Sequence, residues 1–347
     1  METSYNNPKS NIIGKGITEE AIIDAVNKSG YPLQTISASK LVKDFSITQE
    51  WSYVDKDTGA LRTLDIFAQK DLYSHTEKHQ HRVRPALNLL IECKQSELPY
   101  IFFLDTEITH AYNFPVIAGL VNENVRISSD DTISTYNLPI LNVLEMDKHG
   151  FISKNPQFCL SFSKCARKGK ELELSGTDAY NGLILPLSKA VESFKKTKIP
   201  PKTAYYFDAD LVMPIGVVDA PMIGVIVSEG KNKMINIPWV RVLKHETNNS
   251  SDYLEREKTY AIDIIHKDFL ETYINQHLLP FSNEFAKRMI NHQHVIATGE
   301  GYIKGMDNNS FQNIESRLKR KPIISKGNRL KLIVKNFYNN IKGMSDV

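Results

Sequence analysis

Hydrophobic residues in the first third of the chain form two short runs, and each run carries charge where a buried strand is usually apolar. The first run, LRTLDIFA, contains Asp65, and the second run, LNLLIECK, ends with Glu92 and Lys94. Side chains alternate between the two faces of a β-strand, so Glu92 and Lys94 are expected to point the same way. By the same count, Leu64 and Ile66 face the core and Asp65 faces away from it.

Pairing of these two strands would place two carboxylates and one ammonium group on one face. Each carboxylate would then oppose the ionisation of the other. A divalent cation removes this conflict, and hard oxygen ligands suit Mg²⁺. Lys94 would hold a water molecule or a phosphate oxygen beside the metal. Such an arrangement is suited to the hydrolysis of a phosphodiester bond.

Asp65 and the triplet Glu92-Cys93-Lys94 resemble the D…(D/E)-x-K signature of the PD-(D/E)xK nucleases, the restriction-endonuclease-like superfamily. The neighbouring residues agree with this resemblance. The segment that leads to Asp65, EWSYVDKDTGALRTLDI, is typical of a hairpin with its turn at residues 57–59. The segment after Lys94, QSELPYIFF, is similar to the strand that follows the motif in the superfamily.

The resemblance implies an α/β fold of the restriction-endonuclease-like kind, with helices flanking a mixed central sheet that extra strands and C-terminal helices elaborate. It also implies Mg²⁺-dependent cleavage, with Mn²⁺ able to substitute for Mg²⁺. Asp65, Glu92 and the backbone carbonyl of Cys93 would bind the metal, and Lys94 would be the catalytic lysine. A nuclease of this kind resembles enzymes of bacterial restriction, of anti-phage (antiviral) defence or of DNA repair.

An opening helix is a second point of resemblance. Thr18 is typical of a helix N-cap, and Gly30 is typical of a helix end. Many members of the superfamily begin with such a helix, which carries an acid and ends in Gly followed by an aromatic residue, as Gly30-Tyr31 does here. The acid at the site would be Glu20, with Glu19 as the alternative. An acid that only interacts with the helix dipole in the first turn is equally consistent.

A second set of residues, Asp219 with Glu229-Gly230-Lys231, also spells D…E-x-K. Its glutamate and lysine lie beyond an apolar run and around a glycine, where a turn is expected. A turn holds side chains less rigidly than a strand end, so we prefer the first set and keep the second as an alternative. An inactive nucleic-acid-binding or scaffold protein of the same fold, with Asp65 paired to a basic side chain, is a further alternative.

The segment that connects the two acid-bearing strands, KDLYSHTEKHQHRVR, is rich in His, Lys and Arg. We expect it to lie near the metal, where it would contact phosphates. A charged loop that is merely solvated explains the same composition.

The rest of the chain is interpreted as one elaborated core over residues 17–300, with a helix that Pro186 kinks. Residues 1–16 are polar and expected to be disordered. Residues 301–347 form a basic tail, in which residues 329–342 have the spacing of an amphipathic helix. This helix would either clamp a phosphate backbone or dock on the core with its lysines solvated, and a membrane surface is a third option.

Composition narrows the classes of partner. The 347 residues are 41% hydrophobic and 24% charged, as in ordinary globular proteins, and the net charge of +3 means that nucleic acid must be attracted by local patches. Three cysteines without metal-binding spacing, no secretory signal and no long apolar run predict a cytoplasmic protein without a membrane partner. DNA is the expected substrate, RNA stays open, and cleavage of both strands would suit a homodimer.

Overall fold

Two long strands that are almost entirely buried, β3 (Val83–Gln95) and β10 (Phe207–Asp219), lie at the centre of the fold and pair in parallel along their whole length. Near-continuous apolar runs of this kind are typical of strands covered by helices on both faces. The structure is a computed structural model that describes residues 2, 4–105, 114–129, 135–154, 156–247, 257–304 and 312–321.

Ten further strands of the described chain join β3 and β10 in one mixed sheet. They are β1 (Ser46–Val54), β2 (Leu61–Asp71), β4 (Tyr100–Leu104), β5 (Val116–Ala118), β8 (Phe158–Lys168), β9 (Glu171–Ser175), β11 (Met222–Ile226), β12 (Lys233–Asn236), β13 (Trp239–Thr247) and β14 (Glu257–His266). The strand order is β1-β2-β3-β10-β14-β13-β8-β4-β11-β12, with β5 beside β10 and β9 beside β8. The expected α/β class and mixed sheet are confirmed.

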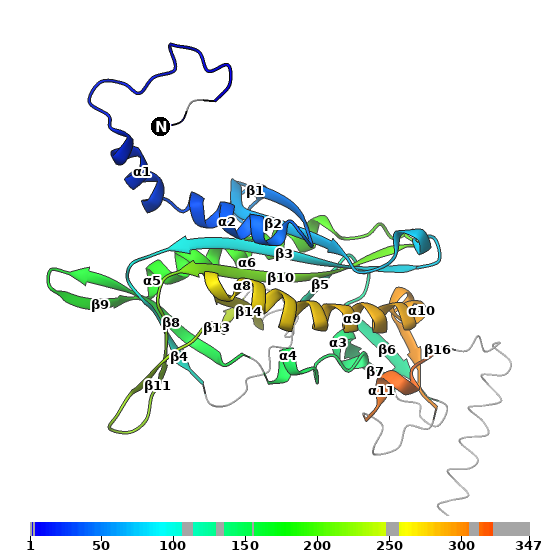
Figure 1. Cartoon of the computed structure of the whole chain (residues 1–347). Helices are drawn as coiled ribbons and strands as arrows, with labels where there is room; N and C mark the ends of the chain where they lie inside the picture. The colour runs from blue at the N-terminus through cyan, green and yellow to red at the C-terminus, as the bar shows by residue number, and fades with distance from the viewer. Residues whose placement is uncertain are drawn as a thin grey trace, which may run out of the picture.

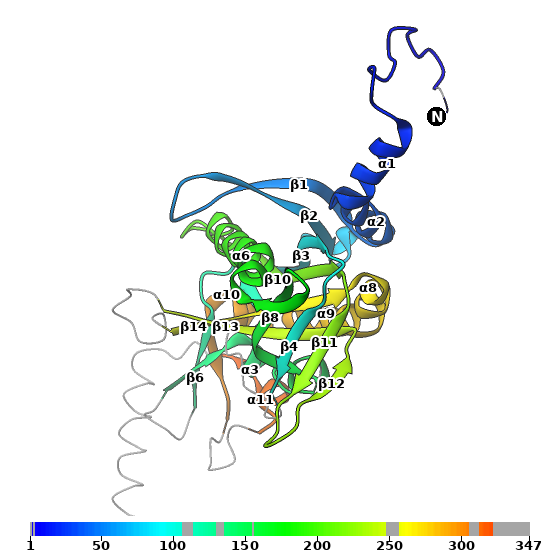
Figure 2. The same ribbon diagram turned by 90° about the vertical axis from the view of Figure 1, so that its left-hand side faces the viewer.

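Helices cover both faces of this sheet, and in Figure 2 β3 and β10 lie between α6 on one side and α9 on the other. The helical segments of the described chain are α1 (Glu19–Lys28), α2 (Tyr31–Leu41), η1 (His75–Glu77), α3 (Ile140–Val143), α4 (Gly150–Ser153), α5 (Gly176–Ala179), η2 (Tyr180–Ile184), α6 (Leu185–Thr197), η3 (Lys267–Phe269), α8 (Leu270–Thr272), η4 (Tyr273–Leu278), α9 (Leu279–Asn291), α10 (Gln293–Thr298) and α11 (Ile314–Arg317). None of the helices in this part of the chain is long and apolar enough to cross a membrane.

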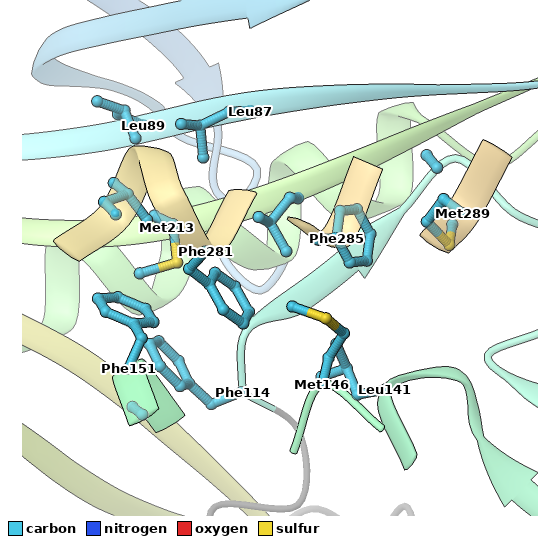
Figure 3. Close-up of a cluster of buried hydrophobic side chains, with 14 of the residues drawn as sticks. Leu87, Leu89, Phe114, Leu141, Met146, Phe151, Met213, Phe281, Phe285 and Met289 are labelled. Atoms are coloured by element: carbon cyan, nitrogen blue, oxygen red, sulfur yellow. The ribbon is translucent and has the colours of Figure 1, made fainter. Parts of the chain in front are cut away.

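The α9 face holds the larger part of the core. Phe281, Phe285 and Met289 repeat every four residues along α9 and are fully buried. They belong to the same buried cluster as Leu87 and Leu89 of β3, and Figure 3 shows them along α9 on one side of that strand. Burying each such side chain stabilises the fold by about 1.5–3 kcal/mol relative to leaving it exposed.

The expected kink at Pro186 takes the form of a widened turn. Pro186 lies in the first turn of α6, and the π-helical turn η2 precedes it. Pro280 has the same position in α9, behind the π-helical turn η4. Proline has no backbone N–H and its ring crowds the preceding turn, so each helix widens before its proline and continues beyond it.

A second sheet of four strands gathers segments from the middle and the end of the described chain. Its strands are β6 (Asn124–Ser128), β7 (Thr135–Pro139), β15 (Glu300–Tyr302) and β16 (Lys319–Arg320), in the order β16-β15-β6-β7. The expected boundary between residues 300 and 301 falls inside β15, so the chain up to Arg320 contributes to this sheet. The helix expected over residues 329–342 lies outside the described residues. The described part of residues 1–16 contains turns and no helix or strand.

A buried ion pair ties β13 to β14 and to the helix above them. Arg241 and Asp263 face each other in the ladder and are both completely buried. Arg241 donates two hydrogen bonds to the Asp263 carboxylate, from Nε at 2.7 Å and from Nη2 at 2.9 Å. The Tyr273 hydroxyl donates a third at 2.8 Å. This fork geometry compensates two charges that would be costly to bury alone.

Candidate active site

The hairpin of β2 and β3 brings Asp65 to the carboxyl end of β3. The described ladder between the two strands ends at the pair Ile66–Ile91. Beyond it, Asp65 Oδ2 accepts a hydrogen bond of 2.6 Å from the backbone N–H of Cys93. A hydrogen bond from the backbone of Asp65 also reaches the Glu92 carboxyl. The two strands therefore separate at Asp65, and its side chain replaces a backbone group as the partner of β3.

Glu92 and Lys94 share one face of β3, as expected. The Lys94 Nζ atom lies 2.6 Å from Glu92 Oε1. The Glu92 side chain is 9% exposed and the Lys94 side chain is 37% exposed, so the carboxylate lies inside the protein and the ammonium group reaches solvent. A Cβ atom on Gly182 of η2 would lie 3.9 Å from Lys94 Cε, which places this face under η2 and α6.

The alternation of side chains slips at Asp65. Leu64 and Ile66 are both fully buried, but Leu64 packs in the cluster on the α6 face and Ile66 packs in the cluster on the α9 face. The expectation that these two residues share a face is therefore wrong. The cause is a local irregularity: Glu50 of β1, which lies opposite Asp65, has a φ of 51°, and neither residue belongs to the β1–β2 ladder. Distortions of this kind turn a side chain out of the regular pleat.

Burial governs the ionisation of this group. Burial, and then the charge of Asp65, raise the pKa of Glu92 to about 7, while Lys94 acts in the opposite direction. Burial also raises the pKa of Asp65, although the Cys93 N–H and the charge of Lys94 counteract it. Burial lowers the pKa of Lys94, but the two carboxylates together outweigh it, and the pKa of Lys94 is raised. Full ionisation of both carboxyl groups therefore costs free energy, which a nearby cation would offset.

Two further residues, which we did not predict, complete the surroundings of Asp65. Gln34 of α2 is buried, and its Nε2 donates to Glu50 Oε1 at 2.9 Å and to the backbone carbonyl of Asp65 at 2.9 Å. The charge of Glu50 contributes to the raised pKa of Asp65. The sequence does contain a signal for α2, because Pro32 stands in its first turn. No local pattern indicates that α2 meets the bend in β2.

Glu20 is not brought to this group by any contact in the described part of the chain. It is exposed on α1, a helix without a buried residue that projects from the body of the protein in Figure 1. The opposite end of α1 is the one that meets β3, where Gln95 Nε2 donates to the carbonyl of Asn27 at 3.1 Å. Glu20 is seven residues before Asn27, which is about 10 Å along a helix. The alternative, Glu19, lies still farther from that contact.

The second D…E-x-K set is dispersed. Asp219 ends β10 and is bound to Lys267, with 2.9 Å between Nζ and Oδ2. Glu229 and Lys231 are exposed in the turn between β11 and β12. This arrangement gives the three side chains of the second set no common centre.

The basic segment between β2 and β3 lies at the wrong end of the hairpin to meet Asp65. The ladder runs from Asp71–Ala86 beside that segment to Ile66–Ile91 beside Asp65. Five residue steps of a strand span about 17 Å. The expectation that this segment lies near the metal is therefore wrong, because an antiparallel hairpin carries its connection at one end and the acids lie at the other.

The donor groups fit a hard cation with few protein ligands. Asp65 and Glu92 supply carboxylate oxygens, and the backbone carbonyl of Cys93 directly follows Glu92 in sequence. Mg²⁺ commonly binds one or two carboxylates and retains several water molecules. Within the described residues, no three His, Cys, Asp or Glu side chains are arranged to hold a metal ion by themselves. Two carboxylates whose ionisation is opposed by burial and by each other therefore suit Mg²⁺ better than a metal that requires three or four side chains.

Comparison with protein-family models, with curated protein sequences and with solved structures finds no match to this chain. The assignment of a function therefore depends on the chemistry of the residues themselves.

Proposed function

We propose that this protein is a Mg²⁺-dependent nuclease of the PD-(D/E)xK, restriction-endonuclease-like kind, and that DNA is its substrate. The observation that carries the proposal is the convergence of Asp65, Glu92 and Lys94 where β2 separates from β3. The mixed sheet with helices on both faces supports it, because that is the architecture the sequence motif implies.

Each residue has a defined task in this proposal. Asp65 and Glu92 bind the metal together with the Cys93 carbonyl, and the hydrogen bond from Cys93 N–H holds the Asp65 carboxylate in position. Lys94 orients the attacking water molecule and offsets the negative charge that develops on the phosphate. Its contact with Glu92 places the ammonium group beside the metal ligands. Mg²⁺ would supply Lewis-acid activation of the phosphodiester and of the water molecule.

The test is cleavage of supercoiled plasmid and of a labelled linear duplex by the purified full-length protein. We expect cleavage in Mg²⁺ or Mn²⁺ and none in EDTA. Asp65→Asn, Glu92→Gln and Lys94→Met should each reduce the rate by about a hundredfold or more, which corresponds to about 3 kcal/mol of transition-state stabilisation. Asp219→Asn and Lys231→Met are matched controls, because they change the same residue types in the dispersed second set.

Two results would contradict the proposal in different ways. Cleavage that persists in both Asp65→Asn and Lys94→Met would place the activity elsewhere, and loss of activity in the Asp219 and Lys231 variants would move it to the second set. Binding of DNA by the wild-type protein without cleavage under any divalent cation would favour the alternative, a non-catalytic nucleic-acid-binding protein. An RNA substrate of the same sequence decides between DNA and RNA.

A further inference from the structure

A polar cavity of about 250 Å³ lies at the opposite end of α6 from the candidate active site. Three acids and three cations line it: Asp71, Asp208, Asp210, Lys78, Arg84 and Lys198. Ala86 of β3 also lines the cavity, and its position in the strand gives it the same face as Glu92, about 20 Å away. In Figure 1 the turn between β2 and β3 and the helix α5 mark these two ends of the sheet.

A buried carboxylate, that of Asp210, lies at the floor of the cavity. Asp210 is 1% exposed, and its carboxylate receives a hydrogen bond of 2.8 Å from Asn88 Nδ2 and an ion pair of 3.1 Å from Lys198 Nζ. Asn88 is completely buried and does not line the cavity, so it holds the Asp210 carboxylate from within the protein. Burial raises the pKa of Asp210, against the charge of Lys198. A carboxylate can accept more hydrogen bonds than these two contacts provide, so this floor is suited to a ligand that brings hydrogen-bond donors.

An aromatic ring holds Arg84 at the wall of the cavity. The Arg84 guanidinium lies 4.5 Å from the centroid of the Tyr206 ring, and no described group accepts a hydrogen bond from its Nε atom. Stacking fixes the plane of the guanidinium, whose N–H groups match the oxygens of a phosphate. The neighbouring Arg82 stacks on Tyr205 in the same way, with 4.7 Å to the centroid, but does not line the cavity.

We propose that this cavity binds one nucleotide, either as a free mononucleotide or as the end of a nucleic-acid strand. Arg84 and Lys78 bind the phosphate, while Asp210 accepts hydrogen bonds from the sugar hydroxyls. A simple anion would satisfy the cations and leave the acids facing another negative charge, so the ligand must carry donors as well as a phosphate. The volume is slightly below the usual range for small-molecule sites, about 300–1,000 Å³, and limits the bound part to about one nucleotide.

The binding site does not depend on the proposed nuclease activity, and its test avoids that activity. Metal-free wild-type protein in EDTA is titrated calorimetrically with adenosine 5′-monophosphate, adenosine, inorganic phosphate and a short 5′-phosphorylated single strand. Arg84→Gln and Asp210→Asn should each weaken binding about tenfold, which corresponds to about 1.4 kcal/mol. Arg82→Gln is the matched control and should leave the affinity unchanged, because its stack on Tyr205 lies outside the cavity. Thermal unfolding of each variant checks that it is folded, and Lys198→Met gives a second probe of the floor.

The outcomes separate the sources of the nucleotide. Binding of the mononucleotide that depends on Arg84 and Asp210 identifies a free nucleotide, and binding of the strand alone with the same dependence identifies a strand end. No binding of either ligand overturns the proposal. It is equally overturned if inorganic phosphate binds as tightly as the nucleotide, or if Arg82→Gln weakens binding as much as Arg84→Gln. Absence of DNA cleavage would bear on the proposed function and leave this titration unaffected.

Discussion

Glu92 couples the candidate active site to the stability of the protein. Its pKa of about 7 lies above the ordinary value of 4.5, so between these two pH values the folded protein keeps a proton that the unfolded chain releases. The folded state therefore binds more protons over this range, and the free energy of unfolding falls as the pH rises through it. At about 1.4 kcal/mol per pH unit, the loss is roughly 3 kcal/mol above pH 7.

We predict that Glu92→Gln removes this pH dependence in metal-free protein. The measurement is urea unfolding in EDTA at pH 4.5, 6 and 8. At each pH it gives the difference in free energy of unfolding between the variant and the wild type. That difference should shift in favour of the variant by roughly 3 kcal/mol from the lowest to the highest pH. Glu229→Gln, at an exposed turn position, is the control and should follow the wild type. If the free energies of unfolding of Glu92→Gln and wild type changed in parallel with pH, folding would not raise the pKa of Glu92.

Among the secondary-structure elements, η2 owes its close approach to the sheet to a glycine. Gly216 of β10 pairs with Glu92, and a Cβ atom at this position would lie 3.0 Å from Leu183 Cδ2. The same turn, η2, contributes Gly182 beside Lys94. A larger residue at position 216 would push η2 outward and loosen the wall of the candidate active site.

We predict that Gly216→Val lowers the free energy of unfolding by about 1–3 kcal/mol and reduces DNA cleavage, because over-packing displaces η2. Urea unfolding and plasmid cleavage measure the two effects. Gly150→Ala is a matched control, since a Cβ atom there meets nothing within 4 Å. Unchanged stability of Gly216→Val would mean that the helix adjusts without strain.

The buried ion pair between β13 and β14 allows two contributions to stability to be compared, that of a buried charge and that of a buried hydrogen bond. Asp263→Ala would leave the Arg241 guanidinium buried without its carboxylate, which costs about 3–5 kcal/mol. Tyr273→Phe removes the hydrogen bond from the Tyr273 hydroxyl to Asp263 and should cost about 1 kcal/mol. Urea unfolding of the two variants tests the difference. Similar losses in both would show that the ion pair contributes little beyond its hydrogen bonds.

For the molecule as a whole, the sequence predicts what depends on local geometry. Strand periodicity places Glu92 and Lys94 on one face, and the hairpin of β2 and β3 brings Asp65 back to them. Both expectations agree with the structure because the two strands follow each other along the chain and pair as one hairpin. The α/β class follows in the same way from alternating apolar strands and amphipathic helices.

Features that depend on distant parts of the chain could not be predicted. Gln34 reaches Asp65 only because α2 packs across the bend in β2, and no periodicity encodes that contact. The slip between Leu64 and Ile66 arises from the backbone of Glu50 on another strand. Glu20 fits the family pattern along the sequence, but the direction in which α1 leaves the body decides where it lies.

The last prediction concerns the whole molecule and does not require cleavage. A cation that binds the folded protein alone raises its stability by RT ln(1 + [L]/Kd), about 2.7 kcal/mol at a hundredfold excess over Kd. Thermal unfolding at pH 8 with and without Mg²⁺ or Mn²⁺ should therefore show a rise in Tm of several degrees. The effect should be larger at pH 8 than at pH 6, because protonation of Glu92, with its pKa of about 7, competes with the metal.

The controls locate this cation. Asp65→Asn combined with Glu92→Gln should abolish the rise in Tm, whereas Asp219→Asn combined with Glu229→Gln should retain it. A rise that survives in the first double variant would place the cation elsewhere. Equal shifts at pH 6 and pH 8 would show that its ligands do not include Glu92.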